Sequence, residues 1–186
     1  MCWMTVRSDT DPLPKAVEAV REHESSNGHS WGWAVARDGE LVIEKGLGMI
    51  PDNELPYGEA ALAHTRFATK GEITKANAHP FAVKRNGEVV AAIAHNGTWY
   101  DAPDIPGWSD SRAMAMILEG VLEDNPDFSF EQAFRALGER TGETLAGVHV
   151  DGNVYVHSGR FKITAEDEVA ASSGCTSELD DGLYAL

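Results

Sequence analysis

The chain has few cysteines, no long hydrophobic run and no recognisable leader. Only Cys2 and Cys175 are cysteines among its 186 residues, which excludes a disulfide framework and a four-cysteine zinc site. No apolar run approaches the roughly 20 residues that a membrane helix needs. The first residues, Met-Cys-Trp-Met, lack the basic start and apolar stretch of a signal peptide. We therefore expect a cytoplasmic protein that does not bind a membrane.

Basic residues are also scarce. The 15 lysines and arginines stand against 30 aspartates and glutamates, which gives a formal net charge of -15. A surface of this sign repels phosphate, so nucleic acid is not an expected partner. An acidic surface with little lysine is typical of a protein kept soluble in high salt, where ions screen the self-repulsion. We predict a halophilic source, with an ordinary acidic cytosolic protein as the alternative.

The remaining composition is that of a globular protein. Hydrophobic residues make up 42% and charged residues 24%, which is enough apolar chain to bury a core. No repeat or low-complexity segment divides the sequence. We expect one domain over residues 1–186, with a loosely held acidic tail from about residue 176.

Strand patterns come in pairs joined by two-residue turns. Asp38-Gly39, Asn86-Gly87 and Asp151-Gly152 each separate two apolar segments. Such dipeptides favour type I′ hairpins because both turn residues need positive φ. Further strands are expected over 2–7 and 61–67. Most of the sheet should therefore be antiparallel.

Three helices are expected between the strands. They cover roughly residues 14–24, residues 111–123 with Asp110 as the N-cap, and the segment after Ser129. Gln132 completes a capping box with Ser129, and Gly142 ends that helix. Paired antiparallel strands with a few helices indicate an α+β fold.

Cys2 is the first candidate for chemistry. If the initiator methionine is removed, this residue carries both a thiol and a free α-amine, and an amine with a pKa of about 8 can act as base for the thiol. A cysteine at this position by chance is the alternative reading.

Three more segments carry candidate site residues. Arg66 follows a strand and presents a planar fork that suits a carboxylate, with the Thr69 hydroxyl nearby. The amide of Asn96 beside the N–H of Gly97 forms a donor pair that could receive an oxyanion. Asp110 could bind an ammonium group. Each segment also has an ordinary role, as a strand cap, a turn or a helix cap.

A metal site is not expected. No pair among the seven histidines has the i, i+4 helical spacing with a nearby acid that zinc enzymes show, and no cofactor motif is present. Cys175 is interpreted as an incidental thiol rather than a second nucleophile.

Taken in order, these segments resemble the class II glutamine amidotransferase domain, a member of the N-terminal-nucleophile hydrolases. The resemblance covers roughly residues 2–160. It rests on the Met-Cys start and on the segments 28–35, 64–69 with 77–80, 95–97 and 109–111. It implies a four-layer αββα sandwich of mostly antiparallel sheets. Differences from the family pattern are Lys70, Arg112 and a short stretch between Asn96 and Asp110.

The resemblance also implies a role for each candidate residue. Cys2 would be the nucleophile, and Asn96 with Gly97 would form the oxyanion hole. Arg66, assisted by Thr69, would hold the substrate α-carboxylate. Asp110, helped by backbone near Gly97, would hold the α-ammonium group.

The implied activity is release of ammonia from L-glutamine through a γ-glutamyl thioester. No synthetase segment occurs within the 186 residues, so we expect a separate protein to accept the ammonia. Two alternatives remain open: hydrolysis of another γ-glutamyl amide, and a catalytically silent binding or structural module if Met1 is retained. The sequence predicts neither the oligomeric state nor the ammonia acceptor.

Overall fold

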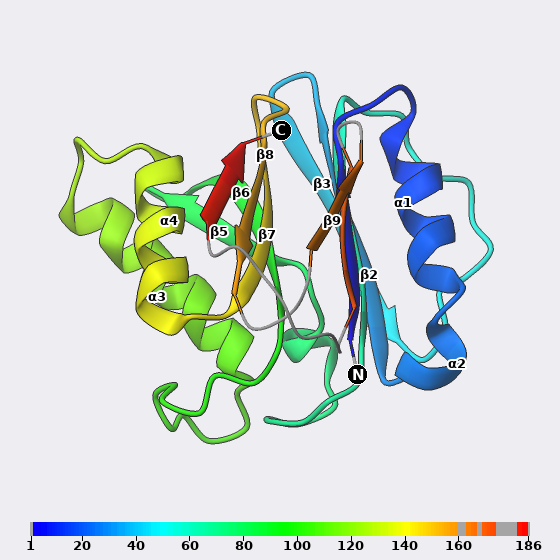
Figure 1. Ribbon diagram of the computed structural model, residues 1–186, viewed down its shortest axis with the longest axis horizontal. Helices are drawn as coiled ribbons and strands as arrows, with labels where there is room; N and C mark the ends of the chain where they lie inside the picture. The colour runs from blue at the N-terminus through cyan, green and yellow to red at the C-terminus, as the bar shows by residue number, and fades with distance from the viewer. Residues whose placement is uncertain (1, 160–162, 167–168, 174–181, 186) are drawn as a thin grey trace.

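The computed structural model describes residues 2–159, 163–166, 169–173 and 182–185. Two antiparallel sheets lie face to face, and helices cover the outer face of each sheet (Figure 1). This arrangement is the four-layer αββα sandwich that was expected. The predicted tail from residue 176 and Cys175 fall largely or wholly outside the described residues.

The first sheet, sheet A, has six strands in the order β3-β2-β4-β1-β10-β9. The central strand β1 pairs with β4 on one side and with β10 on the other. The strands are β1 (Trp3–Arg7), β2 (Ser30–Arg37), β3 (Glu40–Leu47), β4 (Ala60–Arg66), β9 (Ile163–Glu166) and β10 (Val169–Ser173).

The second sheet, sheet B, has five strands in the order β11-β8-β7-β6-β5. Its central strand β7 pairs with β6 and β8, so all described neighbours are antiparallel. The strands are β5 (Phe81–Arg85), β6 (Glu88–Asn96), β7 (Thr144–His149), β8 (Val154–Ser158) and β11 (Gly182–Ala185).

Two of the three predicted type I′ turns are confirmed. Asp38-Gly39 and Asn86-Gly87 have positive φ at both residues, as this turn type requires. The third prediction is wrong, because only Gly152 has positive φ. The N–H of Gly152 donates to the carbonyl of His149, and the His149 N–H donates to Asn153, so the β7–β8 turn spans one more residue on each side.

The three expected helices are present, with differences at both ends of the first and at the start of the second. The helices are α1 (Pro12–Arg21), α2 (Glu24–Asn27), a 3₁₀ turn η1 (Lys75–Asn77), α3 (Asp110–Asp124) and α4 (Phe130–Thr141). The capping box of Ser129 and Gln132 and the left-handed Gly142 are confirmed. The first helix begins at Pro12 rather than near residue 14, and a separate turn, α2, follows it.

The N-cap of α3 is Ser109, not Asp110. The Ser109 side chain accepts a hydrogen bond from the N–H of Arg112, and Asp110 is the first helical residue. The serine takes the capping position because the carboxylate of Asp110 is engaged elsewhere, on the N–H of Trp99.

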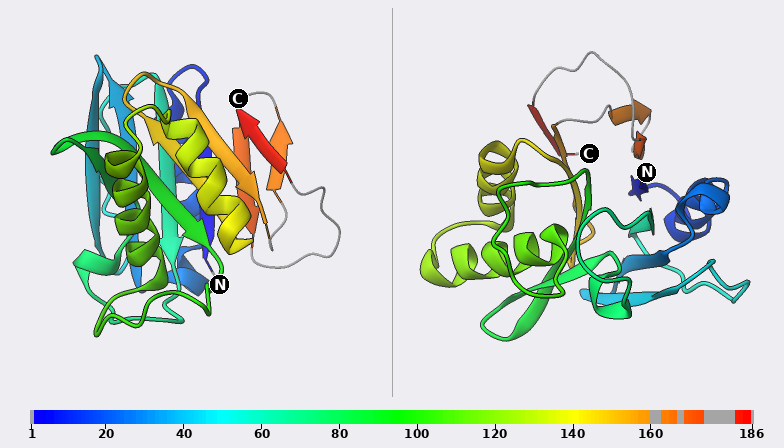
Figure 2. Two further views of the ribbon diagram at one scale, coloured as in Figure 1. Left: turned by 90° about the vertical axis from the view of Figure 1, so that its left-hand side faces the viewer. Right: turned by 90° about the horizontal axis from the view of Figure 1, so that it is seen from below.

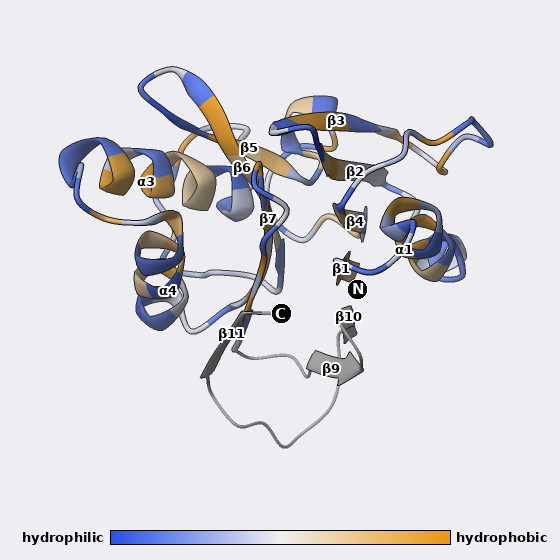
Figure 3. Ribbon diagram, turned by 90° about the horizontal axis from the view of Figure 1, so that it is seen from above, coloured by the Kyte–Doolittle hydropathy of each residue, from blue (hydrophilic) through white to orange (hydrophobic). Residues whose placement is uncertain are grey.

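Three apolar clusters hold the layers together. Small residues fill the space between the sheets, among them Ala34 and Leu62 from sheet A and Ala94 and Val148 from sheet B. A second cluster joins α1 to sheet A, and a third joins α3 and α4 to sheet B. In Figure 3, hydrophobic residues (orange) are frequent on the strands, and hydrophilic residues (blue) are frequent in the peripheral loops. Within the described residues, no helix is both long and apolar enough to cross a membrane.

The sheet topology brings three strand ends together. β1 and β4 are antiparallel neighbours, so the start of β1 lies beside the end of β4, with Trp3 opposite Thr65. β6 of the facing sheet ends at Asn96 on the same side of the molecule. The start of β1 and the loops after β4 and β6 share the lower edge of the molecule in Figure 1 and in the left view of Figure 2. All of the predicted site residues except Asp110 lie at or just beyond these ends.

Candidate active site

Cys2 immediately precedes β1 and is partly buried. Its thiol donates a hydrogen bond to the carbonyl of Phe67 over an Sγ···O distance of 3.6 Å. Burial raises the pKa of the thiol above its usual value, and the carboxylate of Asp110 acts in the same direction. The guanidinium of Arg66 opposes this by lowering the thiol pKa. Arg66, Phe67 and Asp110, all distant from Cys2 in the sequence, thus act on this one sulfur.

Arg66 ends β4 and is only 3% exposed. Its guanidinium donates to the carbonyls of Lys70 at 2.6 Å and Glu72 at 3.4 Å. Burial lowers the pKa of Arg66, and the charge of Asp110 partly offsets this. In the described part of the chain, no carboxylate lies within ion-pair distance of this guanidinium. A buried cation bonded only to neutral carbonyls favours the binding of an anion.

Asn96 is the last residue of β6 and is 2% exposed. Its Nδ2 donates to the carbonyl of Cys2 at 3.3 Å, so the amide of sheet B reaches the first described residue of sheet A. Gly97 follows with a φ of 144°, a conformation that other residues rarely adopt. The Asn-Gly pair therefore lies directly against the candidate nucleophile.

Asp110 is 5% exposed at the start of α3. Its Oδ2 accepts from the N–H of Trp99 at 2.8 Å, and its Oδ1 accepts from the N–H of Ser111 at 3.0 Å. The first bond ties the loop after Asn96 to the helix. Asp110 therefore presents a fixed negative charge that acts on both Cys2 and Arg66.

Thr69 stands apart from this buried group. It is exposed, and its hydroxyl lies 2.8 Å from the hydroxyl of Thr98. This pair joins the loop after β4 to the loop after β6. Thr69 thus bridges the two loops that follow Arg66 and Asn96.

Asn77 and Gly71 hold the loops in register. The Asn77 side chain accepts from the N–H of Ser109 at 3.1 Å and donates to the carbonyls of Glu72 and Gly107. A Cβ built on Gly71 would lie 2.6 Å from the backbone of residues 108 and 109. The segment 64–80 and the start of α3 therefore pack backbone to backbone.

A buried polar chain behind Asp110 was also missed. His95 Nδ1 lies 3.0 Å from the hydroxyl of Ser111, and its Nε2 lies 3.5 Å from the carboxylate of Glu143. Glu143 follows the end of α4 and is fully buried. Glu143 lies 48 residues after His95 in the sequence. A single glutamate in an acidic chain gives no sequence signal for such a contact.

A pair of buried histidines lies beside the site. The rings of His64 and His79 are 4.0 Å apart between centroids, and no ring nitrogen of either has a hydrogen-bond partner in the described residues. Burial lowers the pKa of His64 to about 3 and lowers the pKa of His79 well below its usual value. Both rings are therefore neutral near pH 7.

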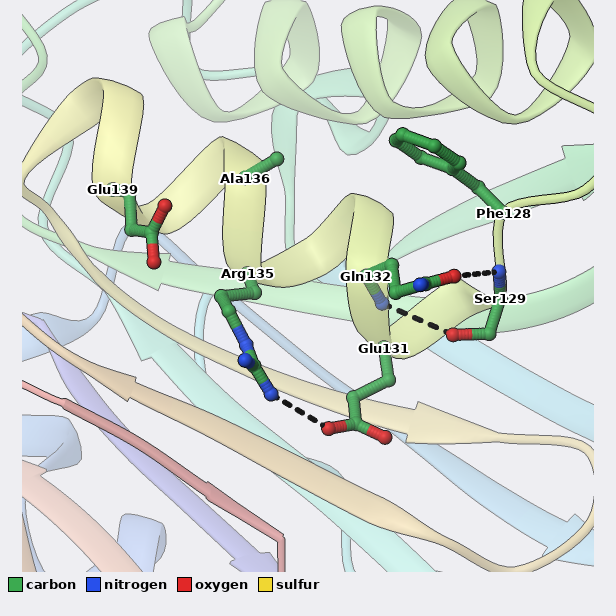
Figure 4. A pocket seen from close by; sticks show the side chains of 7 residues that line it. All are labelled: Phe128, Ser129, Glu131, Gln132, Arg135, Ala136 and Glu139. Atoms are coloured by element: carbon green, nitrogen blue, oxygen red, sulfur yellow. Dashed lines mark hydrogen bonds and ion pairs between the residues drawn. The ribbon is translucent and has the colours of Figure 1, made fainter.

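A hollow on the outer surface of α4 is unrelated to these residues. It is lined by Phe128, Glu131, Arg135 and their neighbours up to Glu139 (Figure 4). It contains the capping box of α4 and an ion pair of 2.9 Å between Arg135 and Glu131. Ser129 pairs with Gln132 and Arg135 with Glu131, and no lining residue belongs to the predicted active site.

Sequence comparison finds relatives that are glutamine–fructose-6-phosphate aminotransferases. The chain is 37% identical over 101 residues to the glutamine–fructose-6-phosphate aminotransferase (isomerizing) of Halobacterium salinarum, covering 52% of this chain and 16% of that protein. It is 32% identical over 189 residues to the enzyme of the same name from Clostridium perfringens, covering 88% of this chain and 30% of that protein. No family model matches the chain.

Solved structures show the same fold. The allosteric regulatory enzyme of purine biosynthesis superimposes with a TM-score of 0.73 at 14% identity, covering 92% of this chain and 41% of that chain. A glutamine phosphoribosylpyrophosphate amidotransferase from B. subtilis gives a TM-score of 0.66 at 15% identity, with the same coverage. The chain belongs to the class II glutamine amidotransferase domains. This is a family of enzymes, and the predicted fold class is confirmed.

The amidotransferase domain spans less than a third of the two curated relatives, 16% and 30% of their lengths. Their names describe whole proteins. The reaction, substrate and partners of this chain therefore do not follow from those names.

Proposed function

We propose that this amidotransferase domain hydrolyses the side-chain amide of L-glutamine and releases ammonia through a γ-glutamyl thioester on Cys2. One observation carries the proposal: the amide of Asn96 and the guanidinium-bearing end of β4 both reach Cys2, although they come from different sheets. A thiol, an amide donor and a buried cation in one place suit the cleavage of a carboxamide on an amino acid.

Two charged residues would hold the substrate. Arg66 offers N–H donors to the α-carboxylate, and Asp110 offers a carboxylate to the α-ammonium group. Thr69 would assist at the carboxylate from the loop edge. Binding both poles of the amino acid places its side-chain amide in a fixed position against the thiol, which is how a binding site lowers the entropic part of a barrier.

The reaction begins when the Cys2 α-amine takes the thiol proton and the sulfur attacks the amide carbon. The oxyanion that forms accepts hydrogen bonds from Asn96 Nδ2 and the Gly97 N–H. The C–N bond then breaks as the amine returns its proton to the leaving nitrogen, giving ammonia and the thioester. Water attacks the thioester carbon, and glutamate leaves as the thiol regains a proton.

This mechanism requires that Met1 be removed, since an acylated nitrogen on Cys2 cannot act as a base. Cysteine has a small side chain of the kind that permits removal of the preceding methionine. The ammonia would be consumed by an acceptor domain or enzyme. The relatives are named as aminotransferases of glutamine and fructose 6-phosphate. Such names are consistent with ammonia as the product of this domain.

The acidic surface gives a second expectation for the working protein. With a net charge of -15, unfolding in low salt relieves more self-repulsion than unfolding in molar salt. A halophilic domain should therefore melt at a clearly higher temperature in molar potassium chloride than in a dilute buffer. Equal melting temperatures would favour an ordinary acidic protein.

The proposed function is tested by ammonia release from L-glutamine with the Met1-free protein. Cys2→Ala should reduce turnover by about 10⁴-fold or more, because it removes the nucleophile. The melting temperature should stay close to that of the parent, since Cys2 lies outside β1 and its side chain makes one long hydrogen bond. Parallel assays with γ-glutamyl conjugates separate glutamine hydrolysis from action on another amide.

Two results would contradict the proposal. Full activity of Cys2→Ala would exclude the thioester. No turnover of any γ-glutamyl amide by the Met1-free protein would indicate a silent module.

A further inference from the structure

His29 is a residue that the proposed reaction has not used. It lies between α2 and β2, and it is partly buried. Its ring Nδ1 accepts a hydrogen bond from the N–H of Ala68 at 2.9 Å. Its own backbone N–H donates to the carbonyl of Arg66 at 3.2 Å. One histidine thus contacts both sides of the turn that follows β4.

The ring also stacks on the side chain between these two contacts. The His29 and Phe67 rings are 4.6 Å apart between centroids, with an angle of 22° between their planes. Three consecutive residues, numbers 66–68, are therefore fixed by a single side chain and its backbone. The first of the three carries the candidate carboxylate-binding guanidinium.

The hydrogen bond from Ala68 has a direct consequence at the sulfur. The Ala68 N–H and the Phe67 carbonyl belong to the same planar peptide group, and in a trans peptide they point in opposite directions. The carbonyl oxygen of that group is the acceptor of the Cys2 thiol at 3.6 Å. Fixing the N–H on His29 therefore fixes the direction of the oxygen that orients the thiol.

We infer that His29 is a positioning residue for the nucleophile: its imidazole holds the 67–68 peptide so that the carbonyl of Phe67 aims at Cys2 Sγ. The inference rests on the proposed function for its catalytic consequence. It also requires a defined tautomer. Nδ1 can accept a hydrogen bond only if it carries no proton, so the neutral ring must bear its proton on Nε2.

A purely packing role for the ring makes a different prediction. If the stack on Phe67 were all that mattered, any flat aromatic ring at position 29 would serve. If the Nδ1 acceptor matters, an amide whose oxygen takes the place of Nδ1 would serve instead. Substitutions at this position separate the two roles. Phenylalanine keeps the ring that stacks on Phe67 but lacks the acceptor, whereas asparagine keeps an acceptor for the Ala68 N–H but lacks the ring.

The experiment compares His29→Phe and His29→Asn by steady-state glutamine hydrolysis. We expect His29→Phe to reduce kcat by about 100-fold, because a misdirected nucleophile loses its alignment. KM should change far less, because the guanidinium of Arg66 is held by the carbonyls of Lys70 and Glu72. His29→Asn should restore most of the lost kcat. His149→Ala, in the β7–β8 turn, is the matched control and should behave like the parent.

Two kinetic outcomes would overturn the inference: parental kcat in His29→Phe, or equal losses in the Phe and Asn variants. A second measurement needs no variant and no activity. Nitrogen NMR of the labelled parent should show His29 with Nδ1 unprotonated and coupled to the Ala68 amide. A proton on Nδ1 would refute the inference even if the domain hydrolyses glutamine. An inactive parent with the expected tautomer would instead count against the proposed function alone.

Discussion

Strands β4 and β6 each end in polar residues that are as deeply buried as the apolar residues directly before them, and the two sets of residues have different roles. In β4, residues 60–63 are apolar and fill the layers on both sides, whereas His64, Thr65 and Arg66 are polar and equally buried. In β6, residues 91–94 give way to His95 and Asn96 in the same manner. The apolar halves supply stability through hydrophobic burial. Burying polar side chains at the strand ends costs free energy of folding. Their presence there therefore points to a function.

The sharpest test of the polar end is Asn96→Ala. Removing one oxyanion donor should lower kcat by about 10²–10³-fold, because the charge on the intermediate loses a fixed partner. Steady-state glutamine hydrolysis measures this, with Asn153→Ala in the β7–β8 turn as the control. A loss confined to KM would mean that Asn96 binds substrate instead of stabilising an oxyanion.

The apolar half is tested by Leu62→Ala, four residues before Arg66 on the same strand. Leu62 is fully buried between the sheets. Its truncation should lower the free energy of unfolding by about 3 kcal/mol, from lost burial and the remaining cavity. Urea denaturation gives this value, and kcat/KM of the folded protein should stay at the parental level. A large loss of activity without loss of stability would contradict the claim that the apolar residues of β4 serve stability and the polar end serves function.

Arg66→Lys tests the guanidinium at the polar end. A lysine keeps the charge but loses the two-pronged contact, so KM for glutamine should rise by about 30-fold, corresponding to about 2 kcal/mol. The matched control is Arg135→Lys on the exposed face of α4, which should leave KM unchanged. An unaltered KM in Arg66→Lys would mean that the α-carboxylate binds elsewhere.

Acid should weaken the fold through the buried histidines of the polar end. The pKa of His64 is about 3 in the folded protein, and that of His79 is also lowered, so the unfolded chain binds more protons below about pH 6.5. Stability is therefore complete above pH 6.5 and falls as the pH decreases. The slope should be about 1.4 kcal/mol per pH unit for each ring.

Urea midpoints between pH 7 and about pH 5.5 measure this slope while most carboxylates are still ionised. His64→Leu should reduce the slope, because it removes one of the two rings whose pKa burial lowers. A parental slope in His64→Leu would show that the loss of stability arises from other groups.

Local signals in the sequence predicted much of the fold. Asn86-Gly87 and the Ser129 capping box were readable because turn and cap chemistry acts over a few residues. The turn at Asp151-Gly152 was not, since the same dipeptide type also serves a longer turn. The N-cap of α3 was misplaced because the long-range bond from Trp99 to Asp110 has no local signal.

The sequence predicted roles only for those site residues that belong to recognisable motifs. Cys2, Arg66, Asn96 and Asp110 were selected by residue type and order, and the structure places them within electrostatic or hydrogen-bond range of one another. Glu143 and His29 were not assigned roles. Each acts through a partner about 40 or more residues away, and only the pairing of strands brings those partners together.

The most direct test of the central claim is intact mass spectrometry of the purified protein before and after reaction with a glutamine-analogue electrophile. We predict a chain that lacks Met1 and gains one analogue, mapped by peptide analysis to Cys2 and absent in Cys2→Ala. A chain that keeps Met1 in its working form, or a label that maps to another residue, would contradict the account.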